Sequence, residues 1–332
     1  MSRSLLVFVG LFAFLYTIPL YAMERFALSV GNAYGAPGEE PLRFAVRDAH
    51  RVQDVLVKLG RVQRKNARVL ENPNPEALKR AIDALGQSAS GDDKTGMLFF
   101  YFAGHGDAQS IHLGNHLLSR KKLLNWLDIF PARLKVVIID SCQTSAVSRE
   151  RGVRAGGDFD IGIVQVPNQQ GTVLISSSSK GEPAHESDLL EGAIFTHFMV
   201  SALLGSADVD EDGQISLQEA FIYSYRNTVR HTARGASTVQ HPSFDFNIDG
   251  SGEIVLTHPG NANAVLVLPP LRDGSYLIFM EASGTVVAEV MTTTDKPVSI
   301  AVPTGRLIVQ QRKQGVFQRA EVYLPYGGKH VL

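Results

Sequence analysis

Two residues of this chain have the chemistry of a nucleophile and its base, and each follows an apolar stretch. Cys142, the only cysteine among 332 residues, comes directly after LKVVIIDS, and His105 follows GMLFFYFAG. A cysteine thiol becomes a strong nucleophile when an imidazole within hydrogen-bond reach takes its proton. Taken singly, the two residues are better explained as a buried thiol and a strand cap, because cysteine is among the residue types most often buried. Together, at the ends of two strands, they favour a catalytic pair.

A pair of this kind needs a sheet that brings the two strand ends together. Apolar runs alternate with segments of helical periodicity, which predicts an α/β fold, a mostly parallel sheet with helices on both faces. The strands are expected in 25–31, 67–70, 96–103, 134–140, 172–179 and, last, 251–259, and the helices in 43–60, 74–85, 119–130, 192–205 and 216–233. Asn74 and Ser119 are expected as helix N-caps. Sites of such sheets form beyond the carboxyl ends of strands, where the amide of Gly106 could bind an oxyanion beside Cys142.

The segments around these two residues resemble the caspase-like cysteine peptidases (peptidase C14), specifically their bacterial metacaspase-like branch. FFYFAGHGD and VVIIDSCQTS are similar to the family's His and Cys segments. Further segments agree in order: LRFAVRDAHRVQDVL, ISSSSKGEPAHES, GAIFTHFMVSALLG and QHPSF. The resemblance covers residues 25 to about 259 and implies a caspase-hemoglobinase fold. It also implies that His105 is the general base and that Cys142 attacks a peptide carbonyl.

Substrate choice depends on two acidic residues. Caspases proper have Gln-Ala-Cys-Arg-Gly, in which the Gln helps to bind a substrate aspartate, whereas this chain has Asp140-Ser141-Cys142-Gln143-Thr144. Metacaspase-like relatives place acids at the positions of Asp48 and Asp140, which implies a pocket for Arg or Lys, and charge complementarity favours the same ligand. We therefore expect cleavage after basic residues. The alternative is that Asp140 caps a neighbouring loop and Asp48 is an exposed helix residue.

A basic loop follows the cysteine. Residues 148–171 are rich in Gly, Arg and Asp, and include Arg149, Arg151 and Arg154. Caspase-like enzymes separate their large and small subunits in this region, so an Arg-specific enzyme could cut itself here. An exposed loop that is merely basic is an equally good explanation.

A second motif, DVDEDGQISLQE over residues 208–219, has the spacing of an EF-hand calcium loop between two expected helices. Calcium requires six to eight oxygen ligands, which three carboxylates and a bidentate glutamate help to supply, and Gly213 permits the sharp turn. The expected ligands are Asp208, Asp210, Asp212, Gln214 and Glu219. The alternative is a degenerate loop that keeps the shape but binds weakly. No organic cofactor is expected.

The two ends of the chain differ from its centre. Residues 1–22 combine one Arg with a long apolar run and a small residue at a cleavage point, which is typical of a signal peptide and predicts export to the periplasm or the extracellular space. An uncleaved membrane anchor is the alternative. Residues 260–332 shift to short β-type runs with tight turns and predict a small β-sandwich-like domain behind a peptidase domain over 23–259.

Charge and composition limit the partners. A net charge of −1 offers no basic field for nucleic acid, so peptides or proteins are the expected substrates. The C-terminal module, in which no residue has catalytic features, is expected to bind a protein or cell-surface partner. A function of another class also fits: a catalytically silent caspase-like domain that serves as a binding or scaffold module. An accessible Cys142 beside His105 would favour the enzyme, and a thiol blocked by packing would favour the scaffold.

Overall fold

A computed structural model of the protein describes residues 23–89, 96–142, 170–236, 238–249, 252–272, 274–291, 296–313 and 315–332. The expected signal peptide and the basic loop with Arg149, Arg151 and Arg154 lie outside these residues. Among the helices of the described ranges, none is both long enough and apolar enough to cross a membrane.

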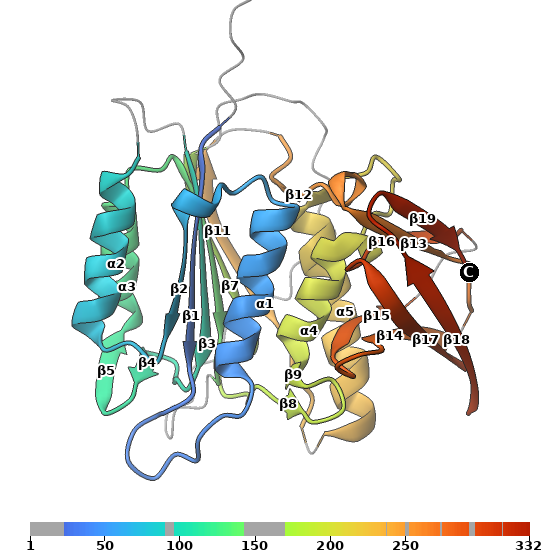
Figure 1. The fold of residues 1–332 in the computed structure, drawn as a ribbon. Helices are drawn as coiled ribbons and strands as arrows, with labels where there is room; N and C mark the ends of the chain where they lie inside the picture. Colours follow the sequence, from blue (N-terminus) through green and yellow to red (C-terminus); the bar gives the residue numbers. More distant parts are fainter. Residues whose placement is uncertain are drawn as a thin grey trace, which may run out of the picture.

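A six-stranded sheet forms the centre of the molecule, with the strand order β11-β7-β6-β3-β1-β2 (Figure 1). Its strands are β1 (Arg25–Asn32), β2 (Ala67–Glu71), β3 (Met97–Gly104), β6 (Leu134–Asp140), β7 (Gln170–Ser176) and β11 (Ser243–Asp249). Five strands are parallel, and β11 runs antiparallel to β7 at one edge. Every residue of β3 is buried, as expected for a strand covered on both faces. The predicted fold class is confirmed.

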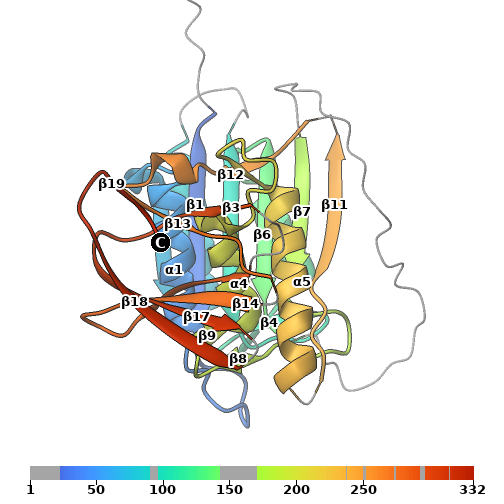
Figure 2. The ribbon, with the colours of Figure 1, turned by 90° about the vertical axis from the view of Figure 1, so that its right-hand side faces the viewer.

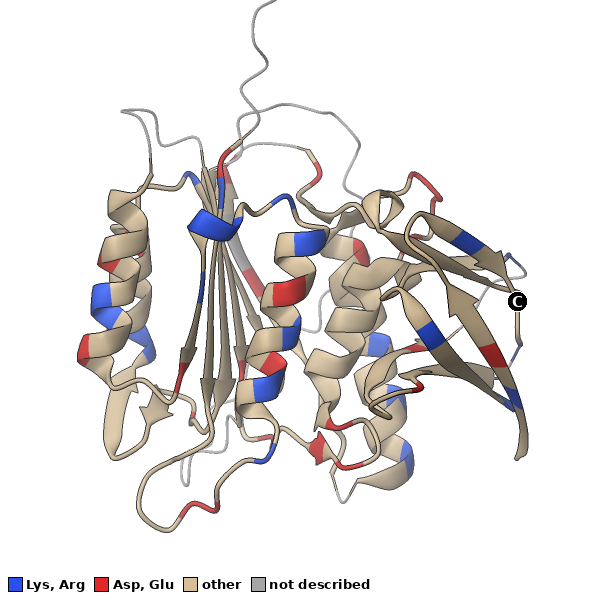
Figure 3. Cartoon of the chain, viewed as in Figure 1, with Lys and Arg blue, Asp and Glu red and all other residues tan. Residues whose placement is uncertain are grey.

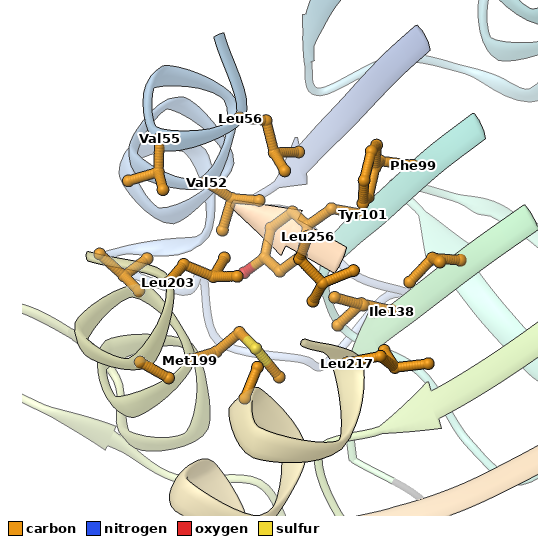
Figure 4. Packing of buried hydrophobic residues seen from close by; sticks show 14 of the residues in the cluster. Val52, Val55, Leu56, Phe99, Tyr101, Ile138, Met199, Leu203, Leu217 and Leu256 are labelled. Carbon is orange, nitrogen blue, oxygen red and sulfur yellow. The ribbon is translucent and has the colours of Figure 1, made fainter. Parts of the chain in front are cut away.

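Helices cover both faces of this sheet (Figures 1 and 2). On one side lie α2 (Pro75–Gln87) and α3 (Arg120–Asp128); on the other lie α1 (Ala45–Lys58), α4 (Ile194–Ser201) and α5 (Leu217–Gly235). Alternate residues of β3 serve the two layers, because successive side chains of a strand point to opposite faces. Phe99 and Tyr101 pack with Val52 and Met199 beneath α1 and α4 (Figure 4), whereas Phe100 packs toward α2 and α3.

The helix starts follow the local sequence signals. Asn74 accepts a hydrogen bond from the backbone N–H of Ala77 at 2.8 Å, and Ser119 accepts one from Lys122 at 3.2 Å. Both predicted N-caps are therefore confirmed. Charged residues lie mainly on helix surfaces and in loops, and the central strands carry few of them (Figure 3).

The last strand expected before the C-terminal module is present, but it does not join the central sheet. β12 (Val255–Thr257) instead pairs with β10 (Ile215–Ser216), and the sheet's sixth strand is β11, which we did not expect.

Short elements complete this part of the chain: 3-10 helices at Arg64–Asn66 and Pro259–Asn261, a π-helix η2 (Ala202–Ser206), β4 (Ser110–Leu113), β5 (His116–Ser119), β8 (Glu186–Ser187) and β9 (Gly192–Ala193).

The C-terminal residues form two further small sheets. The first contains β13 (Ala264–Leu268), β16 (Val298–Ala301) and β19 (Gly328–Val331); the second contains β14 (Gly274–Met280), β15 (Val286–Met291), β17 (Gly305–Lys313) and β18 (Val316–Leu324). They share an apolar core that includes Leu266, Tyr276 and Leu307, and they pack beside α4 and α5 (Figure 1). At this contact the N–H of Glu289 donates to Ser201 Oγ at 3.1 Å. The predicted all-β module is present; its boundary at residue 260 stays a prediction.

Candidate active site

The sheet register brings His105 and Cys142 to the same edge. β3 and β6 are parallel neighbours, and their register pairs Ala103 with Asp140. His105 and Cys142 therefore each lie two residues beyond a paired position, past the carboxyl ends of two adjacent strands at the lower edge of the sheet in Figure 1. This is where an open parallel sheet gathers its functional groups.

The loop before α1 holds the His105 ring. His105 Nε2 lies 2.9 Å from the carbonyl oxygen of Glu40. Because a carbonyl oxygen only accepts hydrogen bonds, Nε2 carries the proton in the neutral ring, and Nδ1 is left as the basic nitrogen. Nδ1 in turn lies 3.9 Å from Oε1 of Glu39.

The thiol of Cys142 is half-buried and is held by one residue of a later segment. The N–H of Ala184 donates to Sγ at 3.3 Å, and Sγ lies 3.8 Å from the carbonyl oxygen of the same residue. Burial raises the pKa of the Cys142 thiol, and the charges of Asp140 and Glu39 add to this effect against the Ala184 N–H. Within the described residues, no hydrogen bond joins the thiol directly to His105. Each member of the pair is thus held by another partner in this conformation.

Gly106, the expected oxyanion donor, packs against the residue that precedes the nucleophile. A Cβ atom at this position would lie 2.9 Å from Ser141 Oγ and 3.0 Å from the carbonyl oxygen of Ser110. Ser141 is buried and accepts a hydrogen bond from Arg120 Nη2 at 3.2 Å. Only a glycine allows the two strand ends to approach this closely.

Asp48 is buried rather than exposed, contrary to the alternative for this residue. Its carboxylate accepts a hydrogen bond from the N–H of Ala193 at 2.7 Å and lies 3.5 Å from Nη1 of Arg51, one helical turn along α1. Burial raises the pKa of Asp48 to about 7, even though Arg51 and the Ala193 N–H favour the ionised form. The nearby charge of Asp140 raises it further.

Asp140 belongs to the same buried cluster. Thr196 Oγ1 donates to its Oδ2 at 2.5 Å, and the hydroxyl of Tyr101 lies 2.6 Å from Thr196 Oγ1. Since the threonine proton is given to the carboxylate, the tyrosine is the donor of the second bond. Burial raises the pKa of Asp140, and burial together with the charges of Asp140 and Asp48 raises that of Tyr101. The structure thus brings the two expected specificity residues together. Asp140 is the last residue of β6, and Asp48 lies in the first turn of α1.

One segment, residues 184–193, touches both halves of this site. Ala184 contacts the Cys142 thiol, and Ala193 binds Asp48. Between them, the carboxylate of Glu186 accepts hydrogen bonds from the backbone N–H groups of Arg43 and Phe44, at 3.1 Å each. A carboxylate is favoured at this place, the N-terminus of α1, because the helix dipole is positive there.

The expected calcium loop lies at the other end of α4, beyond η2. Carboxylate oxygens of Asp208, Asp210 and Asp212 lie within 4.8 Å of one another. Gly213 has φ +77°, the left-handed conformation that its sharp turn requires. Asp208 Oδ1 is buried without a hydrogen-bond partner among the described residues. These features fit a hard cation.

Two expected ligands make other contacts in this loop. Glu219 accepts from the N–H groups of Val209 and Ser216 and from the Ser216 hydroxyl, which completes a capping box at the start of α5. The side-chain amide of Gln214 donates to Asp212 Oδ2 at 2.8 Å. The end of the loop is also tied to β12, because Ile215 of β10 pairs with Thr257 in a short antiparallel ladder.

Four residues around the site escaped the sequence analysis: Glu39, Arg51, His112 and Thr196. Arg51 had a local signal, since a residue three positions from Asp48 shares its helix face. The others reach the site across long separations in sequence, as when Thr196 of α4 meets Asp140 of β6. No spacing rule connects such positions.

Comparisons with known proteins concern the family of the chain. No curated protein matches the chain. A solved structure, that of Caspase-1 from Spodoptera frugiperda, aligns with a TM-score of 0.49 and 13% sequence identity over 70% of this chain and 88% of that chain. The family model described as a caspase domain matches residues 24–247, more than half of the chain. The chain therefore belongs to the caspase-domain family (peptidase C14), whose members are cysteine-type peptidases.

Proposed function

We propose that the protein is a cysteine endopeptidase in which Cys142 is the nucleophile and His105 is the base. The observation that carries this proposal is the register of β3 and β6, which places both residues two positions beyond the last paired residues of two adjacent strands. The scaffold alternative is less favoured, because the thiol is only half-buried.

The reaction follows from the assigned protonation of the ring. His105 Nδ1 takes the thiol proton while Nε2 stays bonded to the Glu40 carbonyl, and the thiolate attacks the peptide carbonyl carbon. The N–H of Gly106 stabilises the resulting oxyanion. The imidazolium then returns its proton to the leaving amine, and water hydrolyses the acyl-enzyme. Because Ala184 holds Sγ, this cycle requires residues 184–193 to move away from the thiol.

Cleavage after Arg or Lys is the specificity that Asp48 and Asp140 support. The charge of Asp140 lies close enough to raise the pKa of Asp48, and Asp48 already faces one guanidinium, that of Arg51. A substrate cation would add to the positive charge here and favour ionisation of both acids. The movement of residues 184–193 that frees the thiol also frees Asp48, since Ala193 is its hydrogen-bond donor.

Calcium is the proposed cofactor, held by Asp208, Asp210 and Asp212, with Gln214 and Glu219 completing the site. When bound, the ion would supply positive charge that offsets the repulsion among these three carboxylates. Since the loop joins η2 to α5, bound calcium would brace the helix pair that carries Thr196. The ion has no role in the proton transfers.

Export and a partner for the C-terminal module complete the proposal. Residues 1–22 have the composition of a signal peptide. In the module, Phe317 and Tyr323 of β18 are 61% and 66% exposed, which supports contact with a protein or cell-surface partner.

The test is to incubate purified protein with fluorogenic peptides that end in Arg, Lys or Asp, with and without calcium, beside Cys142→Ala. We expect cleavage of the Arg and Lys peptides and none by the variant. Failure to cleave any of the three would favour the scaffold. Cleavage of the Asp peptide alone would contradict the proposed pocket and leave the peptidase intact.

A further inference from the structure

The loop between β1 and α1 places a carboxylate, that of Glu39, near the candidate base. At Gly35 a Cβ atom would lie 2.0 Å from Glu39 Oε2 and 2.7 Å from Cδ2 of the His105 ring. The same loop supplies the Glu40 carbonyl that binds Nε2, so two consecutive residues lie next to the two ring nitrogens. The Glu39 carboxylate faces the other nitrogen, Nδ1, which is the one available to the thiol proton.

Glu39 is fixed in this position by groups outside the pair. The N–H of Ala36 donates to Oε2 at 2.5 Å, and Nδ1 of His112 lies 2.8 Å from Oε2 and 3.0 Å from Oε1. His112 is itself buried, and its other nitrogen faces Asp107 Oδ2 at 3.4 Å. Partial burial alone would raise the pKa of Glu39, but these hydrogen bonds and the neighbouring histidines lower it, so the carboxylate is ionised at neutral pH.

We infer that Glu39 is a positioning residue for His105 in the proposed peptidase reaction, with His112 holding Glu39 in place. When the proton of the Cys142 thiol moves to Nδ1, a neutral pair becomes a thiolate and an imidazolium. The new N–H then points into a region that already holds a fixed negative charge, which favours the protonated ring and its orientation. The proton leaves again with the departing amine, so Glu39 is never itself protonated.

The charge environment determines the sign of the expected effect. A negative charge beside the pair opposes formation of the thiolate and favours the imidazolium. It therefore raises the pKa of the Cys142 thiol and that of the His105 ring. Removing the charge of Glu39 must lower both pKa values. The other titratable and charged groups of this region are unchanged in this comparison: His112 from β4, Asp107 from the turn after β3, Asp140 and Cys142 at and just beyond the end of β6, and Arg120 from α3.

The test uses Glu39→Gln, because glutamine has the same shape and its amide oxygen can still accept from Ala36. The matched control is Glu76→Gln, which removes an exposed carboxylate on α2. Since Cys142 is the only cysteine, the rate of whole-protein alkylation by iodoacetamide against pH reports on this thiol alone. We expect the midpoint for Glu39→Gln to fall by about half to one pH unit, as expected for one charge a few ångströms away in a partly solvated site. Glu76→Gln should match the unchanged protein.

Peptide cleavage gives the second measurement. Glu39→Gln should lower kcat/KM roughly tenfold at neutral pH and shift both limbs of the pH profile toward acid, whereas Glu39→Asp, which keeps the charge, should recover part of the rate. An alkylation curve and a pH profile that overlay those of the unchanged protein would overturn the inference, as would a shift toward higher pH. A protein that shows the alkylation shift but cleaves no peptide would support the role of Glu39 and contradict the peptidase proposal.

Discussion

The chain contains two groups of carboxylates that differ in almost every physical respect. Asp48 and Asp140 are buried and come from separate elements. Each accepts a hydrogen bond from a later part of the chain, Asp48 from Ala193 and Asp140 from Thr196. Asp208, Asp210 and Asp212 lie on one short loop, half-buried or exposed, with their oxygens close to one another. The first group is ordered by the fold before any ligand arrives. The second has a geometry that a cation would complete.

This difference determines what each group can do. Burial raises the pKa of both Asp48 and Asp140, so a cation that reaches them would favour their ionised forms. The selectivity that we propose for a basic side chain would depend on this effect. In the loop, burial and the neighbouring Asp charges raise the pKa of Asp208, and a bound divalent ion would remove the repulsion directly. We therefore assign substrate choice to the buried group and stabilisation of a helix pair to the loop, as proposals that the following measurements test.

The largest effect is expected from Asp140→Asn. Asparagine keeps the shape and can still accept from Thr196 Oγ1, so the fold should survive while the charge is lost. Turnover of Arg-terminated peptides should fall by about 100-fold or more, as is typical when a buried charge loses its partner. Asp128→Asn, an exposed acid on α3, is the control and should change nothing. Equal kcat/KM for Asp140→Asn and the unchanged protein would place the specificity elsewhere.

A smaller effect is expected from the titration of Asp48. Because its pKa is about 7, the ionised fraction grows as pH rises from 6 to 8, and the preference for Arg over a neutral side chain should grow about tenfold with it. Asp48→Asn should make that preference independent of pH over the same range. The measurement is the ratio of kcat/KM for matched Arg and norleucine peptides, taken from pH 6 to pH 8 in both proteins. A ratio that rises equally in both proteins would assign the titration to another group.

The same titration has a consequence for stability. The folded pKa of Asp48 lies above the unfolded value of about 3.9, so its contribution to stability is fully present below that value and is lost as pH rises through about 7. Urea midpoints at pH 5 and pH 8 should therefore differ more for the unchanged protein than for Asp48→Asn. This measurement needs no substrate.

The contrast between the two groups also explains what the sequence could predict. The central strands, their alternation with helices and the N-caps at Asn74 and Ser119 depend on neighbouring residues and were predicted correctly. The calcium loop is likewise a local pattern. Its prediction still awaits a binding measurement.

The environment of the buried carboxylates could not be predicted in the same way. Thr196 reaches Asp140 across 56 positions, and Ala193 reaches Asp48 across 145, so their meeting depends on the whole fold. β11 was missed for a related reason. It pairs only with β7, far away in sequence, and its residues SFDFNID carry two acids, which is unusual for a strand in the sheet. Glu39 was missed because its loop has no periodic pattern at all.

The smallest effect is expected at the loop, and it concerns stability rather than turnover. If Asp208, Asp210 and Asp212 hold calcium, saturating the site to about 100 times its Kd should stabilise the fold by about 2.7 kcal/mol and raise the Tm by several degrees. Asp210→Asn should lose this increase, while Asp128→Asn should keep it. We also expect Asp210→Asn to leave the ratio of Arg to neutral peptide cleavage unchanged. That result would show that the two carboxylate groups act independently. Equal melting curves in calcium and in chelator would show that the loop keeps its EF-hand shape without binding the ion.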